Sequence, residues 1–377
     1  MINHHHFWWR FFPKKELTQV YFSAALRSFS ISLLAIFVPL YLFQNRGFSL
    51  NQTLLFFIFY SVIFALCTPI AAAFASRFGL KHSMLLAGPF YLFFIAALHF
   101  LPSTPILLLS ASSFLGASQA FHWMGMHLVF YHVSHPRHRA EEVGIRAGAM
   151  VMGAILGPLI GGFVITFFGF KVLFMITVLL LLGSAIFLFL SKEQYEHYHF
   201  SVKSMFDKKN WKDSLFFISK GTNVIAEGVV WPLLIFFILG SYISMGLVGS
   251  LMSLSSGVLF WAIGKYSDSN GYIYRRKIIR WSTFANSIVL VGQAMVTTVA
   301  QIFAVSILFS LTNAVREAPL GALEYDKAKG QVAEYFVSRE VFICIGRILL
   351  LVLVLITNSL SGGMVFQAFA NFGAFLF

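Results

Sequence analysis

Residues 38–43 read Val-Pro-Leu-Tyr-Leu-Phe, and a similar stretch, Trp-Pro-Leu-Leu-Ile-Phe, stands at residues 231–236. The two stretches are 193 residues apart in a chain of 377 residues. The same offset relates three further pairs of residues: Arg27 and Lys220, Arg146 and Arg339, and Gly153 and Gly346. A repeat that stays in register over half of an apolar chain predicts two stacked copies of a helical membrane unit.

The composition places the chain among integral membrane proteins. Apolar residues make up 58% of the sequence and charged residues 11%, and the mean hydropathy is +0.80, far from the values of a soluble domain. The net charge of +13 does not indicate a nucleic-acid partner, because the basic residues punctuate apolar spans instead of forming a patch with aromatic side chains. Cys67 and Cys344 lie inside apolar segments, so we expect no disulfide, no metal site and no cofactor.

Twelve segments, six in each half, have the length that a helix needs to cross a bilayer, roughly 20 residues. They cover residues 18–43, 52–74, 83–101, 105–132, 143–168, 171–190, 213–238, 242–263, 278–297, 299–324, 335–357 and 363–377. We therefore expect an all-α integral membrane protein with twelve transmembrane helices in two pseudo-symmetric six-helix bundles. The bundles would be residues 1–190 and 213–377, with a cytoplasmic linker at 191–212.

The last of these helices should be short. The offset of the repeat would end it near residue 383, whereas the sequence stops at Phe377. About 15 apolar residues are therefore available for this span, fewer than an upright helix needs. A short, tilted helix, or a chain that lacks its end, would explain the difference.

The basic residues are unevenly distributed between the two sets of loops. With the N-terminus inside, one side receives most of them: Arg77, Lys81, five lysines from Lys192 to Lys212, and Arg275, Arg276 and Lys277. Only Arg46 and Lys171 fall on the other side. Because cytoplasmic loops carry an excess of lysine and arginine, we expect a cell-membrane protein with both termini in the cytoplasm.

A glycine-rich stretch in the fifth span carries the first family signature. Residues 153–162 read Gly-Ala-Ile-Leu-Gly-Pro-Leu-Ile-Gly-Gly. Glycines four residues apart form a groove in which another helix can approach closely, and the proline favours a bend. Ordinary helix packing could explain such a stripe, but the order G-x-x-x-G-P-x-x-G-G resembles the signature of exporters in the major facilitator superfamily. The resemblance implies a part in gating for five residues: Gly153, Gly157, Pro158, Gly161 and Gly162.

A second signature of that superfamily belongs in the loop after the second span and in its counterpart in the other half. The first copy is altered, because Ala72 stands where the family has glycine and Ser76 where it has aspartate. The second copy keeps both types and is followed by a basic cluster. The resemblance, which covers essentially the whole chain, implies that the remaining members close the cytoplasmic gate: Arg77, Lys81, Gly264 and Asp268.

Seven ionisable residues lie well inside the predicted spans, where a charge costs about 3 kcal/mol and is rarely placed without use. They are Arg27, His122, Lys220, Glu227, Arg316, Glu317 and Arg347. Six of them lie on spans one, four, seven and ten, which line the central cavity in the superfamily. The resemblance therefore implies that these residues face the substrate path, together with Gln119 on the fourth span.

Cations outnumber carboxylates in this set, which predicts an anionic substrate. The expected binding residues are Arg27, His122, Lys220, Arg316, Arg347 and Gln119. Glu227 and Glu317 are the candidates for proton coupling, because a carboxyl group in a dry cavity takes up a proton more readily. The alternatives are structural ion pairs, such as Arg27 with Glu227, and a packing role for His122. Since Arg316 and Glu317 are adjacent, we expect them not to pair with each other but with other helices.

These patterns predict a secondary active transporter that moves a small anionic organic solute by alternating access. We expect it to act as a monomer, and the exporter signature favours proton-coupled export as its direction and energy source. The alternative is a transport-inactive membrane receptor or scaffold of the same fold, which the altered gate loop and the short last helix favour. An enzyme is not expected, because the sequence has no phosphate-binding loop, metal-ligand cluster or nucleophile with an adjacent base.

Overall fold

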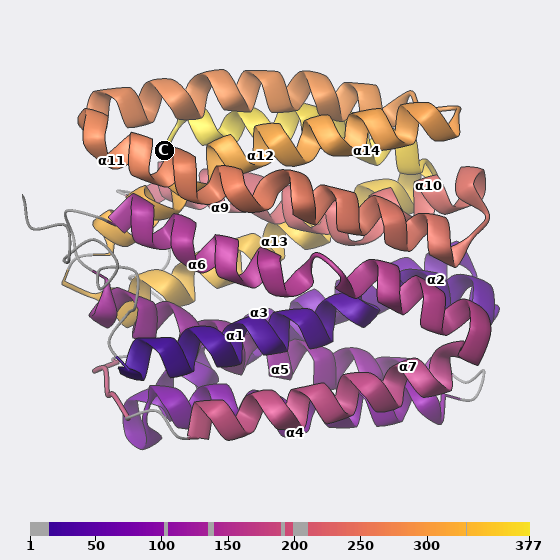
Figure 1. Ribbon diagram of the computed structural model, residues 1–377, viewed down its shortest axis with the longest axis horizontal. Coiled ribbons are helices and arrows are strands. Elements are labelled where there is room, and N and C mark those ends of the chain that lie inside the picture. Colours follow the sequence, from indigo (N-terminus) through magenta and orange to yellow (C-terminus); the bar gives the residue numbers. More distant parts are fainter. Residues whose placement is uncertain (1–14, 102–104, 135–138, 190–192, 199–209, 329) are drawn as a thin grey trace, which may run out of the picture.

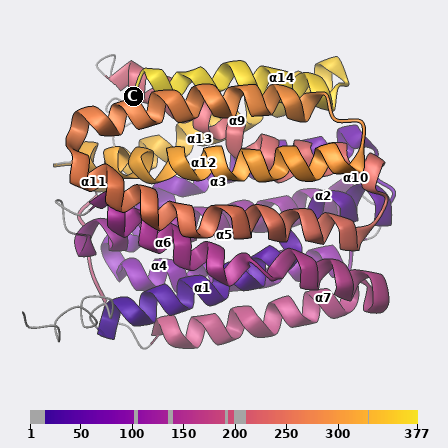
Figure 2. The ribbon, with the colours of Figure 1, turned by 45° about the horizontal axis from the view of Figure 1, so that its top comes forward.

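The computed structural model describes residues 15–101, 105–134, 139–189, 193–198, 210–328 and 330–377. Within these ranges all regular secondary structure is helical, and Figures 1 and 2 show the helices lying side by side along the longest axis of the molecule. Eight of the described helices are long and apolar enough to cross a membrane. The protein is an all-helical, multi-pass membrane protein, as the composition predicts.

The N-terminal half contains the first six predicted spans. Its elements are α1 (Lys15–Ala35), α2 (Val38–Leu40), the π-helical turn η3 (Tyr41–Asn45), α3 (Leu50–Phe78), α4 (Leu80–His99), α5 (Pro105–Val133), α6 (Arg139–Ala154) and α7 (Gly157–Phe189). Within α7 the backbone breaks at Gly169, whose φ of +78° lies in the left-handed region that favours glycine. This break separates the fifth predicted span from the sixth.

The C-terminal half contains the remaining six. Its elements are α9 (Trp211–Ile225), the π-helical turn η6 (Ala226–Val230), α10 (Trp231–Leu239), α11 (Tyr242–Ala294), α12 (Val299–Lys327), α13 (Val332–Thr357), α14 (Leu360–Ala370) and the 3-10 helix η7 (Asn371–Phe375). In Figure 1 the ribbon of α11 turns back on itself, so this element supplies the eighth and ninth spans. The last span is short, as expected. All twelve predicted spans therefore have helical counterparts in the predicted order.

The two repeated prolines interrupt their spans in similar ways. Pro39 lies in α2, directly before the π-helical turn η3, and Pro232 lies at the start of α10, directly after the π-helical turn η6. Proline has no N–H group and clashes with the preceding turn. Local widening of the helix, as in η6 before Pro232, is one way in which membrane helices satisfy the carbonyl groups that a proline leaves free.

The repeat is also present in the contacts between helices. Gly153 of α6 lies against the backbone of Ala25 in α1, and 193 residues later Gly346 of α13 lies against the backbone of Ile218 in α9. In both pairs a Cβ atom on the glycine would overlap a carbonyl oxygen of the neighbouring helix. Only glycine permits this approach, so the two halves pack their first and fifth helices in the same way.

The rest of the glycine stripe connects the two halves. Gly157 and Gly161 face α1, whereas Gly162 lies against the backbone of Tyr242 at the start of α11. The backbone of Pro158 meets Gly246 of α11, and Figures 1 and 2 both show α6 beside α11. The stripe therefore holds α6 and α7 between a helix of their own half and a helix of the other. The division at linker 191–212 stays a prediction, since most of that segment lies outside the described residues.

Candidate functional site

A lysine of the seventh span pairs with two glutamates of the tenth. Lys220 of α9 places its Nζ 2.5 Å from Glu324 Oε1 and 3.2 Å from Glu317 Oε2. The glutamates lie seven residues apart on α12, which is about two turns, so both face α9. Glu317 Oε1 is also 3.2 Å from Nη2 of Arg316. The expectation that these neighbours do not pair was wrong, because their long side chains curl toward each other.

The pairing continues through Arg339 into the other half. Arg339 of α13 donates from Nε to Glu324 Oε2 at 2.6 Å, contacts Glu340, and places Nη1 3.1 Å from Nε2 of His127 in α5. His127 Nε2 is 3.2 Å from Glu340 Oε1, and its Nδ1 is 2.7 Å from the hydroxyl of Tyr325. The exposed fraction is between 1% and 7% for each of His127, Glu324, Tyr325, Arg339 and Glu340. We call the whole set the buried charge network: Lys220, Glu317, Glu324, Arg339, Glu340 and His127.

Two further arginines reach across to the other half and meet tyrosine hydroxyls. Arg347 of α13 donates from Nη1 to the hydroxyl of Tyr60 in α3 at 3.1 Å, and Arg146 of α6 donates from Nη1 to that of Tyr325 in α12 at 2.7 Å. The guanidinium of Arg347 also lies 4.9 Å from the ring centroid of Phe64, a cation–π distance. In the described part of the chain neither arginine forms an ion pair with a carboxylate, so no salt bridge offsets their positive charges at the interface.

Arg316 and Glu227 point into the interior of the C-terminal half. Arg316 is 3% exposed, donates to Asn313 Oδ1 at 2.8 Å and contacts Asn371 of η7. Glu227 lies on the π-helical turn η6, and its polar neighbours are Gln293 of α11 and the positive charge of Arg316. Both carboxylate oxygens of Glu227 are buried, and neither makes a hydrogen bond to another described residue. A carboxyl group in this position has few ways to offset a negative charge.

Arg27 and His122 lie together in the N-terminal half, on α1 and α5. They line a cavity of about 20 Å³ whose other walls come from α4 and α7. Arg27 is 7% exposed, its guanidinium lies 5.8 Å from the centroid of Tyr91, and its Nε and Nη2 have no described hydrogen-bond partner. Every residue around this cavity belongs to the N-terminal half. The structure therefore does not bring Arg27 together with Lys220 or pair it with Glu227.

One end of the bundle, which carries Arg77, Arg139, Asp268 and Arg275, is named the basic end here. Asp268 of α11 accepts the N–H of Ala140 at 3.2 Å and that of the next residue at 2.7 Å, at the start of α6, and pairs with Arg275 at 2.7 Å. Asp326 of α12 pairs with Arg275 at 2.9 Å and with Arg139 at 3.0 Å. A carboxylate at a helix N-terminus satisfies free N–H groups and favours the helix dipole. These contacts join the two halves at the basic end.

The two copies of the predicted gate motif make different contacts. In the second copy, Gly264 lies against the backbone of Ala140, beside the contacts of Asp268. In the first copy, Arg77 is exposed, and the N–H of Lys81 donates to Glu193 Oε1 at 2.7 Å. The second copy therefore reaches the opposite half, whereas Lys81 of the first copy contacts Phe189 at the end of α7 and Glu193 after it.

The sequence profile of the Major Facilitator Superfamily matches residues 20–215, just over half of the chain. The chain belongs to the major facilitator superfamily. The uncharacterized protein YqgE of Bacillus subtilis (strain 168) is 22% identical in an alignment 352 residues long, which covers 86% of this chain and 78% of that protein. The crystal structure of the human organic anion transporter MFSD10 (TETRAN) matches with a TM-score of 0.68 and 14% identity, over 96% of this chain and 98% of that one. At this identity the structural match shows the fold.

Membership confirms the resemblance that the glycine stretch and the gate motif predict. The protein is a membrane transporter of the superfamily and not an enzyme. Superfamily members bind small-molecule substrates in the membrane, and the same architecture serves many substrate classes. The residues of this transporter, and not its fold, must therefore carry any proposal about what it moves.

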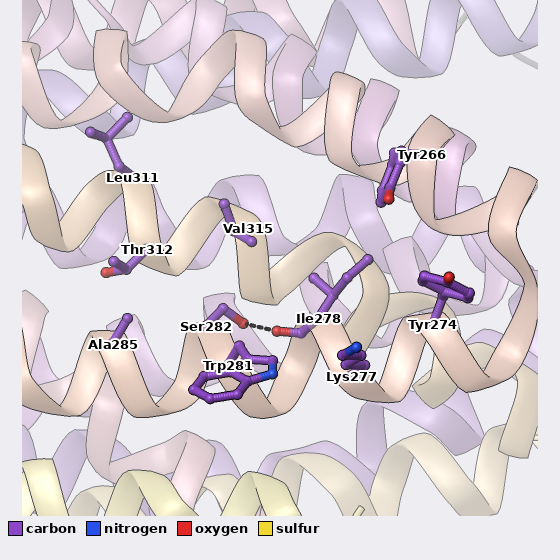
Figure 3. A pocket seen from close by; sticks show the side chains of 10 residues that line it. All are labelled: Tyr266, Tyr274, Lys277, Ile278, Trp281, Ser282, Ala285, Leu311, Thr312 and Val315. Atoms are coloured by element: carbon purple, nitrogen blue, oxygen red, sulfur yellow. Dashed lines mark hydrogen bonds between the residues drawn. The ribbon is translucent and has the colours of Figure 1, made fainter.

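This transporter also has a groove of about 530 Å³ on α11 and α12 (Figure 3). Trp281, Ile278 and Val315 give it an apolar lining, Lys277 lies at its edge, and Trp281 is 66% exposed. None of the predicted site residues lines it. The groove lies between α11 and α12 of the C-terminal half.

The predicted site residues fall into three groups in this transporter. Lys220, Glu317 and Arg316 are brought together, Arg27 and His122 share a separate cavity, and Arg347 lies between the halves. Gln119 is half-buried and accepts a hydrogen bond from the indole of Trp123 at 3.0 Å.

The sequence reasoning missed Glu324 and Tyr325, which hold the buried charge network together. Glu324 is the last residue of the tenth predicted span and Tyr325 follows it, so depth in the span did not mark either as buried. One signal could have found the first: Glu324 follows Glu317 by seven residues and therefore shares its helix face.

Proposed function

We propose that this transporter moves a small organic anion by alternating access, with the anion bound between the two halves near Arg347. The observation that carries the proposal is the pairing of Arg347, which crosses the interface to a tyrosine hydroxyl and has no carboxylate partner in the described residues. A guanidinium is well suited to a carboxylate or phosphate because its planar fork can donate to two oxygens at once.

Arg146 gives the proposed site a second positive charge. Its bond to Tyr325 is also a cation–hydroxyl contact, and the nearby carboxylates of the buried charge network are already taken up by Lys220 and Arg339. A potential that is positive between the halves attracts an anion. The human structural relative is named an organic anion transporter, which agrees with this substrate class although the distant match does not carry it.

Alternating access requires that the halves separate at one end while they stay closed at the other. Contacts exist at both ends: Asp268 with the start of α6 at the basic end, and Phe43 with Phe237, whose ring centroids are 5.6 Å apart, at the opposite end. In the proposed cycle these contacts break in turn. The excess of basic residues supports a cytoplasmic location for the basic end, in a cell-membrane protein.

Glu227 is the proposed site of proton coupling. Glu317 already has two cationic partners, whereas the oxygens of Glu227 have no described hydrogen bond. A buried carboxyl group without a partner is most simply neutralised by a proton. Glu227→Gln should therefore abolish the dependence of transport on a pH gradient while leaving substrate exchange in the absence of a gradient.

The experiment is uptake into proteoliposomes of a panel of labelled carboxylates, organic cations and neutral sugars. We expect saturable uptake of anions, which Arg347→Gln lowers about tenfold or more, in line with the loss of a charge-assisted hydrogen bond. Arg280→Gln, an exposed position on α11, removes the same charge from the surface and should leave uptake unchanged. Selective uptake of cations or neutral solutes, or equal effects of the two substitutions, would overturn the proposal.

One observation favours the second reading, a transport-inactive receptor or scaffold. The first gate copy has Ser76 where the family has aspartate, and the N–H of Lys81 donates to Glu193 in the segment after α7. Binding of an anion without any flux in the same proteoliposomes would select this reading.

A further inference from the structure

The guanidinium of Arg27 lines a cavity, and no described carboxylate pairs with its positive charge. Arg27 lies on α1 inside the N-terminal half, and two of its nitrogen atoms, Nε and Nη2, are buried without a hydrogen-bond partner. In the described residues no carboxylate forms an ion pair with it. An uncompensated charge in a buried site is strongly unfavourable, so a counter-charge from outside the described chain should pair with this guanidinium.

The repeat shows what is missing. Lys220, which is equivalent to Arg27, pairs with Glu317 and Glu324 of α12. At the same offset of 193 residues, the N-terminal half has Met124 and Tyr131 in place of these glutamates. The C-terminal half therefore supplies its own counter-charge, and the N-terminal half does not.

The cavity is the right size for a monatomic ion and too small for an organic solute. Its volume of about 20 Å³ is close to what one water molecule occupies. The Nδ1 atom of His122 also lacks a partner there, and it can donate when the ring carries its proton on that nitrogen. Arg27 and His122 thus bring a positive charge and nitrogen atoms without described partners to the wall of a small cavity.

We infer that a chloride ion, or another halide of similar size, occupies this cavity as a resident counter-ion of Arg27. The ion accepts hydrogen bonds from the guanidinium and from His122. It stabilises the packing of α1 against α4, α5 and α7, and it is separate from the proposed substrate site, because every residue lining the cavity lies in the N-terminal half. The inference does not rest on the proposed direction or substrate of transport.

The first test is the melting temperature of the purified transporter in chloride, bromide, gluconate and sulfate at equal ionic strength. A ligand that binds only the folded state raises the melting temperature. We expect chloride and bromide to raise it by a few degrees relative to gluconate and sulfate, which are too large for the cavity. Equal melting temperatures in all four salts would overturn the inference.

Two variants provide the matched control. Ser184 lines the same cavity, so Ser184→Asp adds a carboxylate beside Arg27 and should remove the halide effect, whereas Ser184→Asn has nearly the same size without the charge and should keep it. If neither variant folds, crystals of the unaltered protein grown in bromide give a direct answer. An anomalous peak at Arg27 is expected, and a water molecule without anomalous signal at that place would contradict the inference.

Discussion

The first helices of the two halves, α1 and α9, have the same packing but different charge chemistry. The hydroxyl of Ser28 in α1 donates to the carbonyl of Met150 at 2.9 Å, and at the equivalent place in α9 Gly221 lies against the carbonyl of Ile343. One residue earlier, Lys220 has two carboxylate partners, whereas the equivalent arginine has none in the described chain. The close backbone contacts, which tolerate little change, are therefore the same in the two halves, whereas the charged partners of the first helix differ.

The largest effect should come from breaking the charge pairs of α9. Lys220→Met leaves Glu317 and Glu324 without their lysine, and removing one partner of a buried pair costs about 3 kcal/mol. Arg27→Met leaves no described carboxylate unpaired and should change the free energy of unfolding by less than about 1 kcal/mol. Unfolding of both variants in detergent measures the difference. Equal losses in a halide-free buffer would show that Arg27 has a counter-charge within the chain.

The equivalent glycines test the shared packing. Gly153→Ala and Gly346→Ala each place a Cβ against a backbone carbonyl, and overpacking of this kind should cost about 2 kcal/mol. Gly228→Ala is the control, because nothing lies within 4 Å of its added Cβ. The melting temperature should fall by similar amounts in the two test variants. A fall in only one of them would contradict the equivalence of the α1–α6 and α9–α13 contacts.

A smaller effect should separate the two gate motifs. Asp268→Asn weakens the acceptor of the first N–H groups of α6, at a cost of about 1 kcal/mol, which is about a fivefold increase in local amide exchange. Ser76→Ala in the first copy should leave exchange at residues 139–142 unchanged. Hydrogen–deuterium exchange measures both. Unchanged exchange in the Asp268 variant would mean that this aspartate does not hold the halves together.

The sequence was sufficient to predict the fold, because the lengths of the apolar segments and the residues that separate them determine where the helices begin and end. All twelve spans and the break at Gly169 between the fifth and the sixth follow from run length, glycine and proline. The close contacts of Gly153 and Gly161 likewise follow from their spacing, since a glycine stripe has few other uses in a membrane helix.

The site was harder to predict because depth in the membrane does not give the rotation of a helix. Arg27 was correctly expected to be buried, but in an apolar helix no polar face shows which neighbour it meets. The buried charge network depends on α5, α12 and α13 converging at His127, Glu324 and Arg339, and only the tertiary packing fixes that. The repeat could have suggested one part of this network, because Arg339 is the equivalent of Arg146. Arg146 donates to Tyr325, and Arg339 donates to the adjacent Glu324.

The most direct test of the account is whether the two halves rock about their interface when an anion binds. Spin labels at Arg77 and Lys265 report on the basic end, and labels at Asn51 and Val299 on the opposite end; all four positions are exposed, and Cys67 and Cys344 are replaced beforehand. Double electron–electron resonance should show two distance populations at each end, which an organic anion shifts in opposite directions. A bound anion that leaves all distances unchanged would contradict alternating access and support the receptor or scaffold.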